Sequence, residues 1–199
     1  MNDYPSYLND IIVEFSKLPG IGYKTAERLS LHLINRKSED VIKFSNAVKN
    51  CKEKLKYCPK CGNFSEENLC SICLDKHRDS KVVCIVQEVK NIYSFEKTRT
   101  FRGVYHVLNG LISPSRGIGP DKLNIESLIK RVKEEKIKEI ILAINPTVEG
   151  EATSCYISKL FPPNEVKITR LAFGIPLGGD LDYIDDITLS RALDFRQNF

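Results

Sequence analysis

The sequence lacks any apolar stretch long enough to cross a lipid bilayer. Its longest purely apolar runs, residues 82–86 and 140–144, fall far short of the ~20 residues that a spanning helix needs. The opening residues, MNDYPSYLND, lack the basic and apolar regions of a signal peptide, so we expect a cytoplasmic protein that is neither exported nor membrane-bound. With 42% hydrophobic and 28% charged residues, the chain can bury a core, which excludes a disordered polymer.

The sequence also lacks a strong excess of charge, and the small excess is unevenly placed. The formal net charge is +4. Residues 1–60 hold 11 Lys and Arg against 7 Asp and Glu, whereas residues 61–199 hold 19 of each. A contact with a polyanion is therefore expected in the first third of the chain. The alternative is a solvated helical surface.

Two patterns of apolar residues divide the chain, which has no internal repeat and no low-complexity tract. Apolar residues spaced by three and four predict helices over residues 8–18, 23–34 and 38–55. After residue 81, strands alternate with helices, which predicts an α/β domain with a mostly parallel sheet covered on both faces. The expected strands are 82–86, 104–108, 139–144 and 166–173, and the expected helices are 87–98, 125–135, 149–161 and 187–199.

Four of the seven cysteines lie at metal-binding spacing, Cys58-x2-Cys61-x8-Cys70-x2-Cys73. Four thiolates from two tight turns suit tetrahedral Zn²⁺ and leave no position for water, so the spacing predicts one structural zinc ion. His77 is a conceivable further ligand. The remaining cysteines, Cys51, Cys84 and Cys155, lie in apolar patterns and are expected to be ordinary buried residues.

The segment LPGIGYKTAERL, residues 18–29, is typical of a helix-hairpin-helix. Gly20 and Gly22 let the backbone approach a phosphate, and the amides that open the next helix, near Thr25, point at the anion. Lys24 and Arg28 share one face of that helix and can contact phosphates without reading bases. The alternative is a plain corner between two helices. The spacing of a P-loop is absent and a helix precedes the segment, which excludes ATP binding here.

Carboxylates follow two of the expected strands. Glu88 comes after the first strand, and Glu149 and Glu151 come after the third. The carboxyl edge of a parallel sheet is a common place for ligands and Mg²⁺, but Glu149 and Glu151 would also stabilise the start of the next helix. Residues 174–186, GIPLGGDLDYIDD, could hold phosphate or metal, or could form a solvated loop.

The order of these segments resembles the RecR family of recombination mediators over essentially the whole chain. The segments LPGIGYKTAERLSLHL, CPKCGN…CSIC, NPTVEGEAT and GIPLGGDLDYIDDITLSRAL are similar to hallmark segments of that family. The resemblance implies an α+β protein of several modules. These are a helical helix-hairpin-helix domain at 1–57, a four-cysteine zinc finger at 58–80, a Toprim α/β domain at 81–175, and a Walker B-like segment with a helical tail at 176–199.

The same resemblance implies a function in DNA repair by recombination. It implies DNA contact at the positions of Lys24 and Arg28, zinc on the four cysteines, and ring-like homodimers or homotetramers. It further implies action with RecO, and in some settings RecF, to load RecA onto single-stranded DNA coated by single-strand-binding protein.

The sequence departs from the Toprim pattern at its acidic positions. Gln87 and Asn91 stand where Toprim enzymes have acidic residues, with Glu88 one place late. Amides do not hold Mg²⁺ as carboxylates do, so we expect a binding protein rather than an enzyme. Two alternatives remain. One is a Toprim nuclease or primase-like enzyme using Mg²⁺ at Glu88, Glu149 and Glu151, and the other is a protein-binding adaptor.

Overall fold

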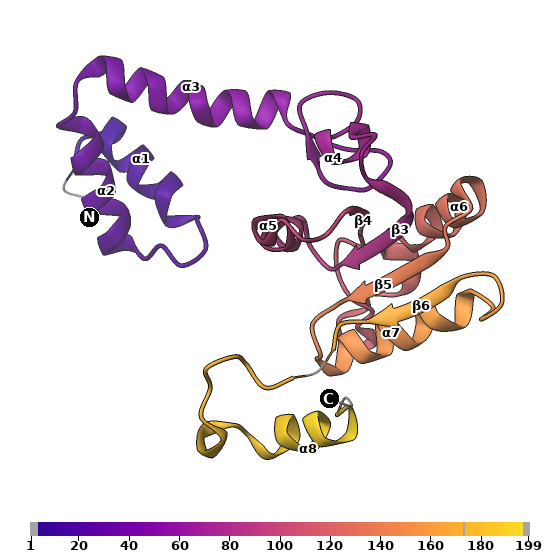
Figure 1. Cartoon of the computed structure of the whole chain (residues 1–199). Helices are drawn as coiled ribbons and strands as arrows, with labels where there is room; N and C mark the ends of the chain where they lie inside the picture. Colours follow the sequence, from indigo (N-terminus) through magenta and orange to yellow (C-terminus); the bar gives the residue numbers. More distant parts are fainter. Residues whose placement is uncertain (1–3, 173, 197–199) are drawn as a thin grey trace. The chain divides into compact units, whose positions relative to one another are not determined.

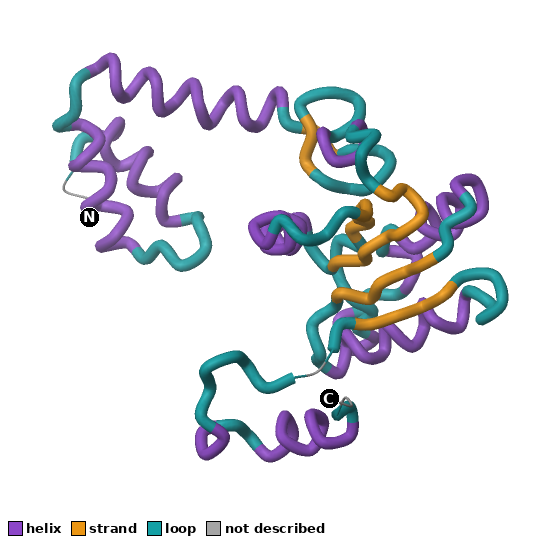
Figure 2. Tube along the Cα trace, viewed as in Figure 1, coloured by secondary structure: helices purple, strands orange, loops and turns teal. Residues whose placement is uncertain are grey.

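A computed structural model describes residues 4–172 and 174–196 of the chain (Figures 1 and 2). The chain divides into two compact units, residues 1–55 and residues 56–199. The second unit therefore joins the four-cysteine segment to the α/β part. Two expected ends, the strand end at Phe173 and the helix end at residues 197–199, lie outside the described residues.

The first unit consists of three helices, α1 (Ser6–Ser16), α2 (Tyr23–Ile34) and α3 (Ser38–Lys54). Helices α1 and α2 pack against each other, and Ile12 and Ala26 are fully buried. Helix α3 has no buried residue, although its apolar residues share the predicted spacing. The expectation that Cys51 is buried was wrong, since this residue is exposed on α3.

A four-stranded parallel sheet forms the centre of the second unit. The strands are β3 (Asp79–Val86), β4 (Gly103–Val107), β5 (Glu139–Ala143) and β6 (Lys167–Arg170), in the order β4-β3-β5-β6. The predicted parallel sheet is confirmed. The last strand ends three residues earlier than expected, because its ladder with β5 closes at Arg170.

Helices cover the two faces of this sheet unequally (Figure 1). Helices α6 (Ile125–Glu135) and α7 (Val148–Leu160) pack on one face, where Val83 and Ile85 of β3 are fully buried. The other face receives α5 (Val89–Thr98) and the four-cysteine segment. Cys84 is buried there, and its burial raises the pKa of the thiol to about 12. Cys155 on α7 is exposed, so the expectation of burial was wrong at that position.

Short elements complete the second unit. Strands β1 (Lys56–Tyr57) and β2 (Phe64–Ser65) form an antiparallel pair beside α4 (Ser71–Leu74). Two 3-10 turns, η1 (Pro114–Arg116) and η2 (Pro120–Lys122), precede α6. The last elements are η3 (Leu181–Tyr183) and α8 (Asp186–Asp194). Among the described residues, none of the helices is long and apolar enough to span a membrane.

The acidic residues near the end of the chain act as helix caps. The side chain of Asp180 accepts a hydrogen bond from the backbone N–H of Asp182. Asp185 accepts bonds from the backbone N–H and the hydroxyl of Thr188, and the pKa of its carboxyl is lowered, first by the Thr188 N–H and then by the Thr188 hydroxyl. These two acids therefore begin helical turns within a segment for which a solvated loop was one of the expectations.

Candidate functional site

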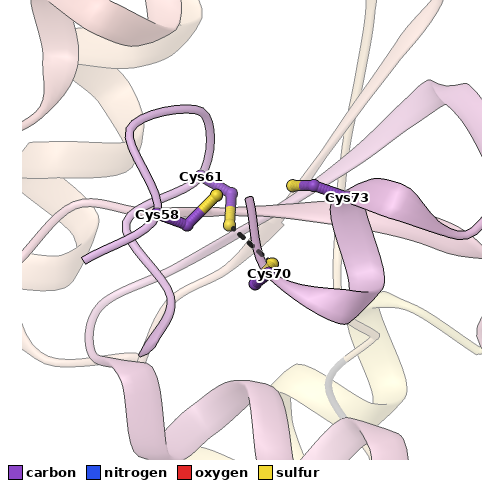
Figure 3. A group of neighbouring side chains, drawn as sticks. All are labelled: Cys58, Cys61, Cys70 and Cys73. Carbon is purple, nitrogen blue, oxygen red and sulfur yellow. Dashed lines mark hydrogen bonds between the residues drawn. The ribbon is translucent and has the colours of Figure 1, made fainter. Parts of the chain in front are cut away.

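The four predicted metal ligands meet at one point. The sulfur atoms of Cys58, Cys61, Cys70 and Cys73 all lie within 4.8 Å of one another. Figure 3 shows that they come from two separate segments of the chain, with Cys58 and Cys61 on one and Cys70 and Cys73 on the other. Among the residues that the structure describes, no other group of three or more His, Cys, Asp or Glu side chains is placed to hold a metal ion.

Each half of the cluster is shaped by a tight turn. The backbone N–H of Gly62 donates to the carbonyl of Cys58 over 2.8 Å, and Gly62 has a φ of +77°, which favours glycine. The N–H of Asn63 points at the sulfur of Cys61 over 3.4 Å. In the other half, Cys70 begins the short helix α4 and Cys73 lies within it. The two turns therefore aim all four sulfurs inward.

The electrostatics of the cluster favour a bound cation. Donation of its own hydrogen bonds to Cys70 and Cys73, followed by burial, raises the pKa of Cys61, whereas the hydrogen bonds that Cys70 accepts from Cys61 and Cys73 lower the pKa of Cys70. One thiol thus ionises at the expense of its neighbours. A central dication would stabilise all four thiolates together.

These residues fit zinc in number, type and geometry. Zinc–sulfur bonds of about 2.3 Å place tetrahedral sulfurs roughly 3.8 Å apart, and the Sγ atoms of Cys61 and Cys70 lie 3.5 Å apart. Cys58, Cys61 and Cys70 are each at most 2% exposed. Four protein ligands leave no position for water, so the zinc ion is structural. His77 is not part of the cluster, and its N–H donates to the side chain of Asp75.

The metal centre is joined directly to the sheet, a connection that the sequence did not reveal. The N–H of Val107 in the edge strand β4 donates to the carbonyl of Cys61 over 2.8 Å. A Cβ atom on Gly62 would lie 3.2 Å from the Cβ of Val107. Lys60 forms an ion pair of 3.1 Å with Glu135 at the end of α6. The only signal in the sequence was the glycine directly after the first cysteine pair.

The hairpin, residues 18–28, forms a second candidate site in the first unit. The N–H of Ile21 donates to the carbonyl of Leu18 over 3.0 Å and closes a turn. Gly20 occupies this turn with a φ of +80°, and Gly22 is the N-cap of α2. A Cβ atom on either glycine would meet nothing within 4 Å. The hairpin is therefore open to an approaching ligand.

The start of α2 offers donors and positive charge without internal partners. The carbonyl of Gly22 accepts from the N–H groups of Thr25 and Ala26. The backbone N–H groups of Gly22, Tyr23 and Lys24 have no acceptor among the described residues. The side chains of Lys24 and Arg28 are exposed and form no ion pair within the described part of the chain. Glu27, the acid between them, accepts a hydrogen bond from Tyr4 over 2.7 Å.

The hairpin therefore has the properties of an anion site. Free amides at a helix N-terminus and the helix dipole attract a phosphate. Two cations one helical turn apart extend the attraction to a neighbouring phosphate. Thr25 is half-buried beside them.

The three carboxylates at the carboxyl edge of the sheet each have a separate role. The side chain of Glu88 contacts Lys90 over 2.7 Å and accepts from the amide of Gln87. Glu151 forms two contacts, of 2.8 and 3.3 Å, with Arg170. Glu149 lies in the first turn of α7, where its charge faces the positive end of the helix dipole.

The turn before α7 explains the local sequence around these acids. Thr147 caps the helix, and its hydroxyl accepts from the N–H of Gly150 over 3.1 Å. A Cβ atom on Gly150 would lie 2.0 Å from the carbonyl oxygen of Asn145. The geometry of the turn thus explains why Thr147 and Gly150 occupy these two positions.

Comparison with models of known protein families gives four matches along the chain. Residues 8–52 match the RecR helix-hairpin-helix, residues 55–75 the RecR four-cysteine zinc finger domain, residues 81–172 the Toprim domain, and residues 174–197 the RecR C-terminal segment. These matches span nearly the whole chain, follow the predicted order, and place the zinc finger on the four converging cysteines. The chain therefore belongs to the RecR family of recombination repair proteins, with one structural Zn²⁺ in its four-cysteine finger.

Proposed function

We propose that this chain is a non-catalytic mediator of recombination that binds DNA through the hairpin. The observation that supports the proposal is the combination at the start of α2. Three backbone amides there lack acceptors within the described residues, and Lys24 and Arg28 are exposed beside them. Gly20 and Gly22 leave the space in front of the amides open. Such a site binds phosphate and makes no contact with base edges, so binding is independent of sequence.

Assembly and partners form the second part of the proposal. One hairpin contacts few phosphates, so a homodimer or homotetramer that presents several hairpins to one DNA gains avidity. In this function the ring-like homodimer or homotetramer acts with RecO, and with RecF in some settings. It helps to load RecA onto single-stranded DNA coated by single-strand-binding protein. Membership of the RecR family supports this assignment.

The absence of catalysis is also part of the proposal. The carboxylates of Glu88 and Glu151 are engaged by Lys90 and Arg170. Magnesium in proteins is held by carboxylates that are free to coordinate it. We therefore expect no DNA cleavage by the purified chain with Mg²⁺. Nicking that disappears in Glu149→Ala would instead establish a Toprim enzyme.

The decisive experiment measures DNA binding by fluorescence anisotropy at several salt concentrations. The double variant Lys24→Ala/Arg28→Ala should bind more weakly than wild type. Each lost phosphate contact should flatten the plot of log affinity against log salt by about 0.7 to 0.9. A matched control removes the same charge from two exposed lysines of the second unit, Lys133→Ala/Lys159→Ala, and should leave the slope unchanged.

The same variants test the mediator function. RecA loading on strands coated by single-strand-binding protein, followed through the ATPase activity of RecA with RecO present, should require the wild-type hairpin. A folded Lys24→Ala/Arg28→Ala protein that binds DNA with the wild-type slope would exclude the hairpin as the DNA contact. A chain that binds RecO but never DNA would instead be a protein-binding adaptor.

A further inference from the structure

The carboxyl edge of the sheet holds a cavity that the proposed function does not use. Its volume is about 320 Å³, which is at the lower end of the range for small-molecule sites. Four elements line it, namely α5, the end of β5 with the turn that follows, α7, and the end of β6. The residues used in the following argument are Asn91, Ser94, Phe95, Asn145, Ser154 and the pair Glu151–Arg170.

The charges that line this cavity cancel. Among the described residues of its wall, only Glu151 and Arg170 carry charged side chains, and they contact each other through both guanidinium nitrogens Nη1 and Nη2. A divalent cation would need carboxylates that are not already paired. A free anion would have to compete with Glu151 for Arg170. The lining therefore favours an uncharged group.

The remaining polar groups of the wall can donate and accept hydrogen bonds. Asn91 uses its Oδ1 atom to accept from the N–H of Glu88 over 2.9 Å, which directs its two Nδ2 protons elsewhere. The side-chain amide of Asn145 and the hydroxyl of Ser154 have no hydrogen-bond partner among the described residues. Asparagine amides pair with the edges of bases by donating and accepting at once.

Apolar groups complete the lining. Phe95 on α5 lines the wall, with Ala143 at the end of β5 and Pro146 in the turn that follows. Aromatic rings bind unstacked bases of single strands through their faces, regardless of sequence. The cavity thus joins apolar side chains, Phe95 among them, to amide and hydroxyl groups that can form hydrogen bonds with a planar heterocycle.

We propose that this cavity binds one unstacked nucleobase of single-stranded DNA. The inference rests on the proposed function, because a mediator of recombination acts on single strands. The cavity adds a contact with a base, which the hairpin does not provide, since the hairpin contacts phosphate alone. The cavity would distinguish single-stranded from double-stranded DNA, because a base within a duplex cannot enter it.

The test compares two fluorescent 15-mers with the same backbone and charge, dT15 and a fully abasic 15-mer, on the full-length zinc-loaded protein. Wild type should bind dT15 about tenfold more tightly, because stacking of one base is worth about this factor. Ser94→Phe fills the cavity from α5, where Ser94 is exposed. This variant should bind dT15 only as well as the abasic strand. Ser154→Phe fills the cavity from α7 and should act in the same way.

A matched control and the salt of the buffer complete the design. Ser127→Phe makes the same change at an exposed serine of α6, and Ser127, like Ser94, bonds through its hydroxyl to a backbone carbonyl one turn earlier. It should keep the tenfold preference. The preference should also persist in buffer without Mg²⁺ and should be unchanged by 1 mM dTMP, which has no strand to anchor it.

The outcomes separate this proposal from the function on which it rests. Equal binding of both strands by wild type overturns the cavity proposal and leaves the hairpin as the DNA contact. A preference for dT15 that survives in Lys24→Ala/Arg28→Ala and is lost in Ser94→Phe supports the cavity. Unchanged affinity of Lys24→Ala/Arg28→Ala for both strands contradicts the hairpin. A preference that requires Mg²⁺, or that both filling variants retain, overturns the cavity proposal. Absence of binding to either strand overturns both proposals.

Discussion

Two glycine turns in this molecule look alike in sequence but differ in their surroundings. Gly62 follows the first cysteine pair and Gly20 lies in the hairpin, and both have a φ near +80°. A Cβ atom on Gly62 would press against Val107, whereas a Cβ atom on Gly20 would meet nothing within 4 Å. The first turn is packed inside the protein and the second faces open space. A positive φ alone therefore does not distinguish a structural turn from a binding turn.

The contrast extends to the polar groups beside each turn. Next to Gly62, the carbonyl of Cys61 is bonded to Val107 and the side chain of Lys60 is paired with Glu135. Next to Gly20, the amides of Tyr23 and Lys24 lack acceptors in the described part of the chain. Buried polar groups are normally satisfied within the protein, so unpaired donors that remain exposed are available for a ligand. This difference predicts that substitutions at the zinc turn lower the stability of the protein, whereas substitutions at the hairpin weaken its binding to DNA.

The largest effect is expected from the zinc ligands. Cys61→Ser removes one of four thiolates and should reduce zinc from one ion per chain to almost none. The free energy of unfolding of the second unit should fall by more than about 4 kcal/mol, because the metal supplies much of the folding energy of such a module. Zinc content by mass spectrometry and urea unfolding measure the two effects.

Cys155→Ser is the matched control for this prediction. Cys155 is exposed and lies outside the metal cluster, so this variant should keep one zinc ion and the wild-type unfolding midpoint. Full zinc occupancy in Cys61→Ser would show that the ligand set has been assigned wrongly.

The next effect concerns the sheet that the zinc turn packs against. His106 of β4 is 1% exposed, and its Nε2 atom lies 2.8 Å from the carbonyl of Asn124. Burial lowers the pKa of its imidazole to about 4, against a partial rise from the Asn124 carbonyl and a further lowering by Arg131. Well above pH 6.5 the ring is neutral in both the folded and the unfolded state. As the pH falls from 6.5 towards 4, the unfolded chain takes up the proton first, so stability declines by at most about 3 kcal/mol.

Urea unfolding of the second unit at several pH values tests this prediction. His106→Gln should remove this part of the decline, and His32→Gln, at an exposed position of α2, should retain it. Protonation of the zinc ligands is common to both variants and cancels in their difference. Identical pH profiles for His106→Gln and wild type would contradict the assignment of the decline to His106.

The two glycines can be compared directly by alanine substitution. Gly62→Ala should destabilise the second unit by about 2 kcal/mol, because the positive φ costs roughly 1–2 kcal/mol and the added Cβ meets Val107. Gly20→Ala should cost only about 1 kcal/mol but should weaken DNA binding, since the methyl group enters the space in front of the amides. Urea unfolding and DNA-binding anisotropy should be measured on both variants. The contrast between the two turns would be wrong if both variants lost mainly stability, or if both lost mainly DNA affinity.

The sequence predicted best the features that depend on local chemistry. Helix α2 has the expected bounds Tyr23–Ile34, because Gly22 caps its start. The four zinc ligands were predicted correctly because the spacing of the two cysteine pairs indicates which sulfur atoms can bind one metal ion. The parallel arrangement of the four strands followed from their alternation with helices.

Features that depend on distant partners could not be predicted. Helical spacing placed Phe44 and Val48 on one face of α3, but it does not show what covers that face, and both are exposed. The contact of Lys60 with Glu135 joins residues far apart in the sequence. The pairing of Glu151 with Arg170, which neutralises the cavity, similarly depends on how β6 lies beside α7.

The smallest effect tests how firmly the zinc turn is held against the sheet. Lys60 and Glu135 are 30% and 24% exposed in their side chains, so their ion pair is partly shielded from solvent. Lys60→Ala should lower the free energy of unfolding by about 0.5–1 kcal/mol without changing zinc content. Lys130→Ala, which breaks the more exposed pair with Glu134 on α6, should cost less. Equal costs in urea unfolding would mean that the Lys60 contact adds nothing beyond an ordinary surface pair. The hold on the zinc turn would then rest on the backbone bond between Cys61 and Val107 and on the packing of Gly62.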